Sequence, residues 1–139
     1  MEQLGRNDQT VSTVGTITSP QHAMNFVKHY NDAPESGIVS ILRLNAKNEV
    51  IGITRGQSEM GSEWRLATVR EAVKEKGCSG IVVIYCKPDL NPGSICRDTE
   101  GIHDLKRKLY AMSISLIDVI AVCKDRFYSY ADERISKTA

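Results

Sequence analysis

The chain has 139 residues, enough for one domain with its own hydrophobic core. Its 41% hydrophobic and 25% charged residues are ordinary for a globular protein, and a net charge of +1 supports neither a nucleic acid nor an anionic membrane as partner. The longest apolar run, residues 81–86, is too short to span a bilayer. The polar residues 1–10 do not resemble a signal peptide, so a reducing cytoplasm is the expected location.

The first half of the chain predicts one helix and a β-hairpin. Residues 1–17 are polar and threonine-rich, which indicates an N-terminal arm or a peripheral strand. Ser19 followed by Pro20 is typical of a helix start, and apolar residues recur after it at helical spacing. Residues 38–45 are rich in β-branched side chains and predict a strand, which a turn connects to a returning strand at 49–54.

The second half alternates helices and strands. The pattern predicts, in order, a helix at 66–76 that ends at Gly77, a buried central strand at 81–86, a helix that begins near Asp98 with Ile102, Leu105 and Leu109 facing inward, and strands at 115–123 and 126–131. The order α-β-β-α-β-α-β-β predicts an α/β fold, a three-layer α-β-α sandwich around a mixed central sheet. We expect a single domain over residues 18–135 and a short tail at 136–139.

The segment between the central strand and the third helix is the most informative part of the sequence. Tyr85 and Lys87 are two residues apart at the strand end, so their side chains lie on one face, whereas Cys86 faces the other way. Ligands of α/β sheets collect beyond the carboxyl ends of strands. Asp98, at the predicted helix start, is either a simple helix cap or part of a site at this edge.

Short motifs identify no chemistry. The four cysteines form no C-x-x-C pair and predict free thiols rather than a zinc site. The three histidines, His22, His29 and His103, are scattered along the chain, and H-E-x-x-H, G-x-S-x-G and P-loop patterns are all absent from the sequence. Motifs alone therefore predict no more than a globular α/β domain.

The overall pattern from residue 19 to residue 133 nevertheless resembles a known family. The stretches "SPQHAMNFVKHY", "IVSILRLNAKNEVIGI" and "LIDVIAVCKDRFYSYADE" resemble the first helix, first hairpin and ending of the RadC-like domain, a branch of the JAB/MPN (JAMM) metallopeptidase superfamily. The trailing "ADE" is similar to the ending of a bacterial subgroup of this family, whose members are often carried on mobile elements. The resemblance implies a three-layer sandwich like that of cytidine deaminases. The family name carries a DNA-repair label.

Active members of that superfamily cleave peptide or isopeptide bonds with zinc. They carry H-x-H-P-S-G, then a serine, an aspartate three residues later, and an upstream glutamate. The resemblance implies that the histidines and the aspartate hold zinc, the glutamate acts as general base and the serine stabilises the oxyanion. Zinc needs three protein ligands and an open position to make a nucleophilic hydroxide near neutral pH.

In this sequence the zinc ligands are largely replaced. The two histidine positions fall on Tyr85 and Lys87, and only the aspartate is retained, as Asp98. A lysine binds a metal only when deprotonated, which its usual pKa of about 10.4 opposes. Cys86 faces away and does not substitute for them. Lys87 and Asp98 are instead predicted to form an ion pair that replaces the metal as the link between strand and helix.

The remaining positions of the family site are also changed. The oxyanion serine falls on Ile95, with Ser94 one residue out of place, and Asp89 stands where the family has serine. The general base falls on Gly37, with Glu35 two residues earlier. The resemblance thus defines a vestigial pocket made of Gly37, Tyr85, Lys87, Asp89, Ile95 and Asp98.

These replacements favour a catalytically silent domain that binds a protein or peptide, for example an extended peptide added to a sheet edge. No cofactor is expected, since zinc belongs to the active relatives. A homodimer is compatible with this interpretation, and the sequence does not identify the partner.

Two enzymatic alternatives stay open. One is a zinc-dependent metallopeptidase or isopeptidase with rearranged ligands, such as Asp98 with His103 or a cysteine. The other is a metal-free hydrolase that uses Lys87 and Tyr85, which requires a lowered lysine pKa that a neighbouring Asp98 opposes. A scaffold in which the pocket has no role is the third interpretation.

Overall fold

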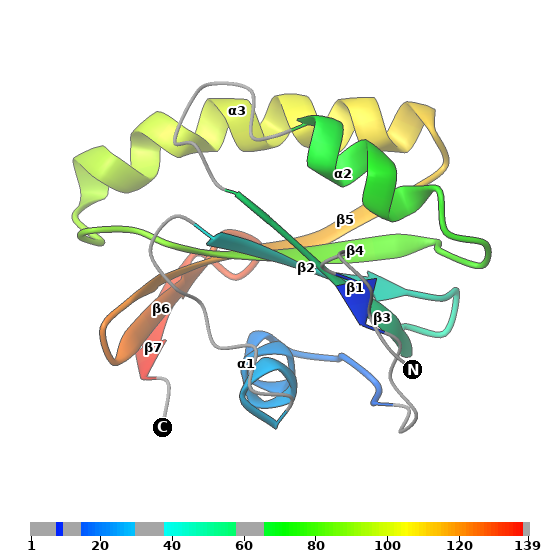
Figure 1. Ribbon diagram of the computed structural model, residues 1–139. Helices are drawn as coiled ribbons and strands as arrows, with labels where there is room; N and C mark the ends of the chain where they lie inside the picture. The colour runs from blue at the N-terminus through cyan, green and yellow to red at the C-terminus, as the bar shows by residue number, and fades with distance from the viewer. Residues whose placement is uncertain (1–7, 10–14, 30–37, 58–65, 138–139) are drawn as a thin grey trace.

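The computed structural model describes residues 8–9, 15–29, 38–57 and 66–137. Within them, seven strands form one mixed sheet in the order β1-β3-β2-β4-β5-β6-β7 (Figure 1). The strands are β1 Asp8–Gln9, β2 Ile38–Leu44, β3 Val50–Gln57, β4 Gly80–Cys86, β5 Ser115–Cys123, β6 Arg126–Ser129 and β7 Arg134–Lys137, and the helices are α1 Pro20–His29, α2 Leu66–Val73 and α3 Pro92–Ala111. None of the helices in these ranges is long and apolar enough to cross a membrane.

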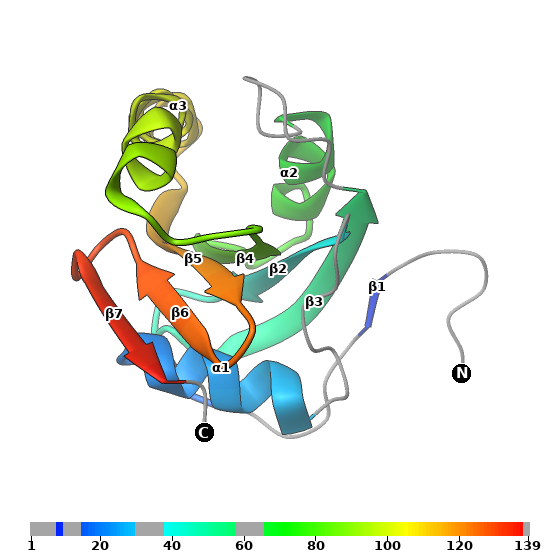
Figure 2. The same cartoon turned by 90° about the vertical axis from the view of Figure 1, so that its left-hand side faces the viewer.

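The sheet is antiparallel except at its centre, where β4 and β5 run parallel and α3 connects them. Helices α2 and α3 lie on one face of the sheet and α1 lies on the other (Figures 1 and 2). Because side chains alternate along a strand, β4 supplies both cores. Val83 and Tyr85 pack toward α2 and α3, whereas Val82 and Ile84 pack toward α1.

Most predicted elements are confirmed. The α1 start has the expected capping bond, with the backbone N–H of His22 donating to Ser19 Oγ at 3.2 Å. Ile102, Leu105 and Leu109 are buried as predicted. The predicted end of the second helix at residue 76 is wrong, because α2 ends at Val73 and a turn separates it from Gly77, whose φ of +89° favours glycine. Strand β7 was not predicted; it pairs with β6 beyond the last expected strand.

The predicted start of the third helix is wrong. Helix α3 begins at Pro92, and Asn91 is its N-cap, accepting the Ser94 N–H on Oδ1 at 2.8 Å. Asparagine followed by proline is a strong helix-start signal, because asparagine caps the first turn and proline is preset for the first helical position. Asp98 therefore lies in the second turn of α3, where its side chain is not needed as a cap.

A buried carboxylate fixes the turn after β6. Asp118 Oδ1 accepts the N–H groups of Val119 at 2.7 Å and Ala131 at 2.9 Å, and Oδ2 accepts the Ser129 hydroxyl at 2.6 Å. Burial is the main cause that raises the pKa of Asp118. Between these contacts, the Tyr130 N–H donates to the Val119 carbonyl at 3.0 Å, so the network holds Tyr130 in place.

Replacing this carboxylate should destabilise the domain. Asp118→Ala leaves the Ser129 hydroxyl and two N–H groups without their acceptor, which we expect to lower the free energy of unfolding by about 2–3 kcal/mol in urea denaturation. Asp132→Ala is the matched control, since that exposed aspartate lies in the same turn, and should change it by less than about 0.5 kcal/mol. Equal effects of the two substitutions would contradict this role for Asp118.

Candidate functional site

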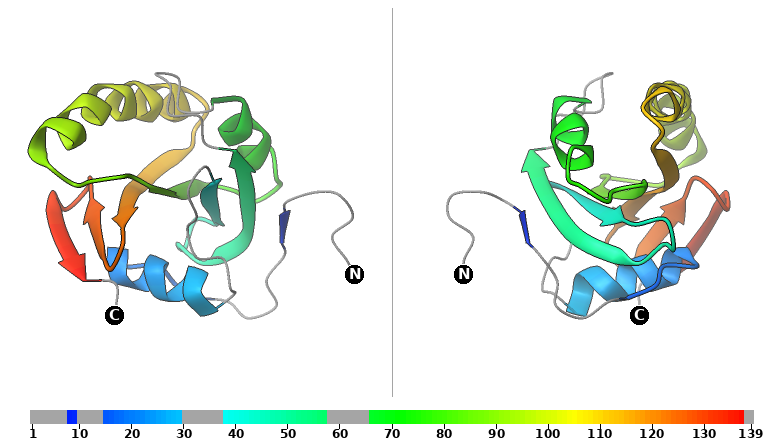
Figure 3. Two further views of the ribbon diagram at one scale, coloured as in Figure 1. Left: turned by 60° about the vertical axis from the view of Figure 1, so that its left-hand side comes forward. Right: turned by 90° about the vertical axis from the view of Figure 1, so that its right-hand side faces the viewer.

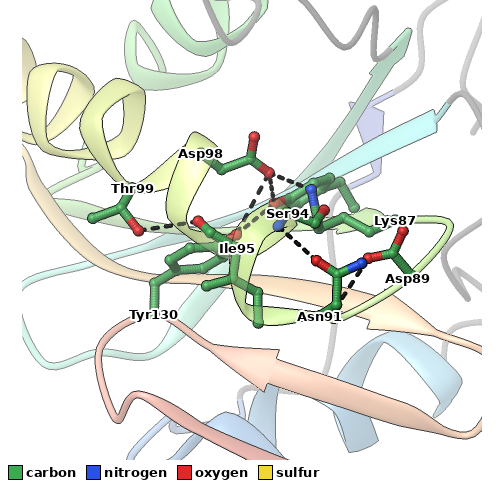
Figure 4. A network of polar contacts seen from close by, with 9 residues as sticks. Lys87, Asp89, Asn91, Ser94, Ile95, Asp98, Thr99 and Tyr130 are labelled. Carbon is green, nitrogen blue, oxygen red and sulfur yellow. Dashed lines mark hydrogen bonds and ion pairs between the residues drawn. The ribbon is translucent and has the colours of Figure 1, made fainter.

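The candidate site lies where β4 ends beneath the beginning of α3 (Figure 4). Tyr85 is in β4, paired in register with Ala121 of β5. Lys87 follows the strand, and its N–H still donates to the Val122 carbonyl at 2.8 Å. The sheet geometry therefore continues through Lys87, which places its side chain on the same face as that of Tyr85.

The site is organised around one carboxylate oxygen. Lys87 Nζ lies 2.6 Å from Asp98 Oδ2, and the Tyr85 hydroxyl donates to the same oxygen at 2.8 Å. The side chains of Lys87 and Asp98 are only 5% and 17% exposed, so this ion pair is largely shielded from solvent. The predicted contact between Lys87 and Asp98 is confirmed.

Tyr130 completes the network from the far end of the chain. Its hydroxyl is 3.1 Å from the Tyr85 hydroxyl and 3.5 Å from Asp98 Oδ2. Burial is the largest cause that raises the pKa of both Tyr85 and Tyr130. Both side chains are therefore neutral phenols near neutral pH, and Tyr85 acts toward Asp98 as a hydrogen-bond donor.

The other predicted positions do not join this network. Asp89 Oδ1 accepts the Asn91 N–H at 3.1 Å and so orders the loop. Ile95 is half-buried and packs against the core beneath α3, and the neighbouring Ser94 is buried. The general-base positions Gly37 and Glu35 lie outside the described residues.

The residues present do not fit a zinc ion. Lys87 and Tyr85 offer an ammonium and a neutral phenol, both of which donate to Asp98 Oδ2 and so compete with a metal for that oxygen. Over the described ranges, no three His, Cys, Asp or Glu side chains cluster as metal ligands. The rearranged set of Asp98 with His103 is not supported, because His103 is exposed and lines a separate cleft.

Sequence reasoning missed Tyr130 as a member of the site. The sequence segment "RFYSYA" contains Tyr130, but it does not indicate which other element of the fold this side chain contacts. Tyr130 lies 32 residues from Asp98 in the sequence, and the two come together through the pairing of β5 with β6 and the hydrogen bonds of Asp118 in the turn that follows.

The fold and the site together describe an α/β domain with a polar network that joins strand, loop and helix at the end of a central parallel strand. The family model of the RadC-like JAB domain matches residues 17–135. The chain therefore belongs to the RadC-like JAB domain family, as its sequence resemblance implied. A comparison with curated proteins found no match.

Removing one partner of the ion pair should be costly. Lys87→Met leaves a mostly buried Asp98 carboxylate without its counter-charge, and we expect the free energy of unfolding to fall by about 2–3 kcal/mol in denaturant titrations. Lys74→Met is the control, because Lys74 pairs with Glu71 at 2.9 Å with both side chains about 70% exposed, and should cost less than about 1 kcal/mol.

The double variant Lys87→Met/Asp98→Leu separates pairing from general packing. It removes both charges, so it should be more stable than Lys87→Met alone, with a coupling energy of about 1–3 kcal/mol. If Lys87→Met were as stable as the wild type across neutral pH, the ion pair would have no structural role.

Proposed function

We propose that this domain is a catalytically silent RadC-like JAB domain that acts by binding a protein or peptide. One observation carries the proposal. The single zinc-ligand position that keeps its residue, Asp98, directs Oδ2 to Lys87 Nζ at 2.6 Å and to the Tyr85 hydroxyl at 2.8 Å. Those donors come from the two positions that hold zinc histidines in the active relatives.

The same contacts disfavour both kinds of hydrolysis. Zinc-dependent cleavage needs ligands that donate lone pairs, and an ion-paired ammonium has none to offer. A metal-free hydrolase needs a lysine nitrogen that is free to act as base or nucleophile, but Lys87 Nζ is held in an ion pair with Asp98 Oδ2 at 2.6 Å. Tyr85 is held as a phenol by burial, which raises its pKa and opposes a role as base or metal ligand.

The proposal includes the architecture and setting of the domain. We assign residues 18–135 to one three-layer α-β-α sandwich in the cytoplasm, supported by α1 lying opposite α2 and α3 and by the family match. A protein or peptide partner is favoured over DNA, despite the family's DNA-repair label, because the net charge is only +1.

Restoring the family's ligands should restore metal binding. We expect the purified wild type to hold less than about a tenth of an equivalent of zinc after incubation and desalting. Tyr85→His/Lys87→His places two imidazoles beside Asp98 and should raise this toward one equivalent, measured by elemental analysis.

Adding Asp98→Ala to that double variant is the control and should remove the gained zinc. A wild type that carries about one equivalent of zinc and loses it on Asp98→Ala would contradict the silent-domain proposal. Peptidase activity that depends on that zinc would contradict it as well.

A further inference from the structure

The sheet ends in an open edge at β7. Among the described strands, β7 pairs with β6 on one side and has no neighbour on the other. Figures 2 and 3 show β7 along the outer margin of the sheet, with no labelled helix or strand beyond it. Arg134, Ile135 and Lys137 are exposed, and Ile135 is a large apolar side chain with 43% of its surface accessible. An open edge of this kind is a template for pairing with another strand.

The hydrogen bonds of β6 show which of its residues face β7. Residues of an antiparallel strand bond alternately to the neighbours on their two sides. The Tyr130 N–H, next to the strand, donates to the Val119 carbonyl of β5 at 3.0 Å. The Ser129 carbonyl instead accepts the Glu133 N–H at 2.7 Å, on the side of β7. Ser129 and Phe127 therefore direct their backbone groups toward β7.

The same alternation determines which backbone groups of β7 point outward. The register partners of these two β6 residues are Arg134 and Ser136, which therefore bond to β6. The N–H and C=O groups of Ile135 and Lys137 consequently point away from the sheet. A strand that is added at this edge must form its hydrogen bonds with these two residues.

The edge also presents two opposite charges on one face of the sheet. Ile135 is opposite Tyr128 of β6, which packs on the α3 face. Lys137, two residues further along β7, lies on that face as well, opposite the like charge of Arg126. Glu133 is on the same side, because it lines the cleft beneath α3 together with Tyr128. Neither Glu133 nor Lys137 forms an ion pair with any described residue, so both are available to a partner.

We propose that β7 pairs with β7 of a second copy of this chain, antiparallel and with Ile135 opposite the partner's Ile135. In this register the two outward-facing Ile135 residues exchange two backbone hydrogen bonds, and their side chains cover each other. Glu133 of each copy lies beside the partner's Lys137, which gives two symmetric ion pairs. On the other face Arg134 lies opposite the partner's Ser136, so no like charges are directly opposed. The pairing rests on this edge alone and does not depend on the proposed loss of catalysis.

Other arrangements match the edge less well. Only registers that bring outward-facing residues together form the hydrogen bonds, so the partner can shift only in steps of two residues. A shift in one direction places Ile135 opposite the partner's Lys137, and a shift in the other places Arg134 opposite the partner's Arg134. A foreign strand of a single charge would be repelled by either Glu133 or Lys137. A second copy satisfies both charges at once.

Sedimentation velocity of the full chain tests this pairing. A four-residue edge makes a small interface, so we expect a reversible dimer that forms between about 10 µM and about 1 mM protein. Ile135→Pro removes the outward N–H, which does not bond to β6, and should abolish the dimer while the circular dichroism spectrum stays unchanged.

Two charge reversals test the register. Lys137→Glu and Glu133→Lys each turn both ion pairs into repulsive contacts, so each variant alone should dimerise at least about tenfold more weakly. Mixed in equal amounts, the two variants should form a heterodimer of about wild-type affinity, because each contact again joins opposite charges. Lys47→Glu, which changes an exposed lysine in the turn between β2 and β3, is the matched control and should leave the dimer unchanged.

A chain that stays monomeric at the highest concentration would overturn the proposal. A dimer that Ile135→Pro leaves intact would overturn it as well, because another surface would then hold the two copies. Equal weakening by Lys47→Glu and Lys137→Glu, or failure of the mixed variants to restore the dimer, would show that these ion pairs do not form and would reject the proposed register.

Discussion

One carboxylate oxygen, Asp98 Oδ2, joins three parts of the chain that are far apart in sequence. Lys87 reaches it from the end of β4, Tyr85 from within β4, and Tyr130 from the turn after β6. A charge this deeply placed is tolerated only when it is paired and hydrogen-bonded. The arrangement therefore fixes the position of α3 over the sheet by an internal ion pair.

Two carboxylates stabilise this end of the domain, Asp118, which is buried, and Asp98, which is largely shielded from solvent. Asp98 holds α3 to the end of β4, and Asp118 holds the turn that carries Tyr130. Tyr130 is the element common to both, because its N–H bonds to β5 and its hydroxyl approaches Asp98. Its ring also lines the cleft beneath α3.

Local patterns predicted much of this site, and long-range contacts explain what they missed. The two-residue period of a strand was enough to place Tyr85 and Lys87 on one face, whereas the contact between Lys87 and Asp98 was predicted from the family resemblance. The start of α3 was predicted near Asp98, although Asn91 followed by proline is itself a helix-start signal. Tyr130 could not be assigned, since its approach to Asp98 depends on strand pairing that local spacing does not encode.

A crystal structure of the wild type grown with excess zinc tests the central claim most directly, because anomalous scattering locates the metal independently of the protein atoms. The ion-pair account predicts Lys87 Nζ within hydrogen-bonding distance of Asp98 Oδ2 and no anomalous peak at that carboxylate. A zinc peak bound to Asp98, with the Lys87 side chain displaced, would contradict it.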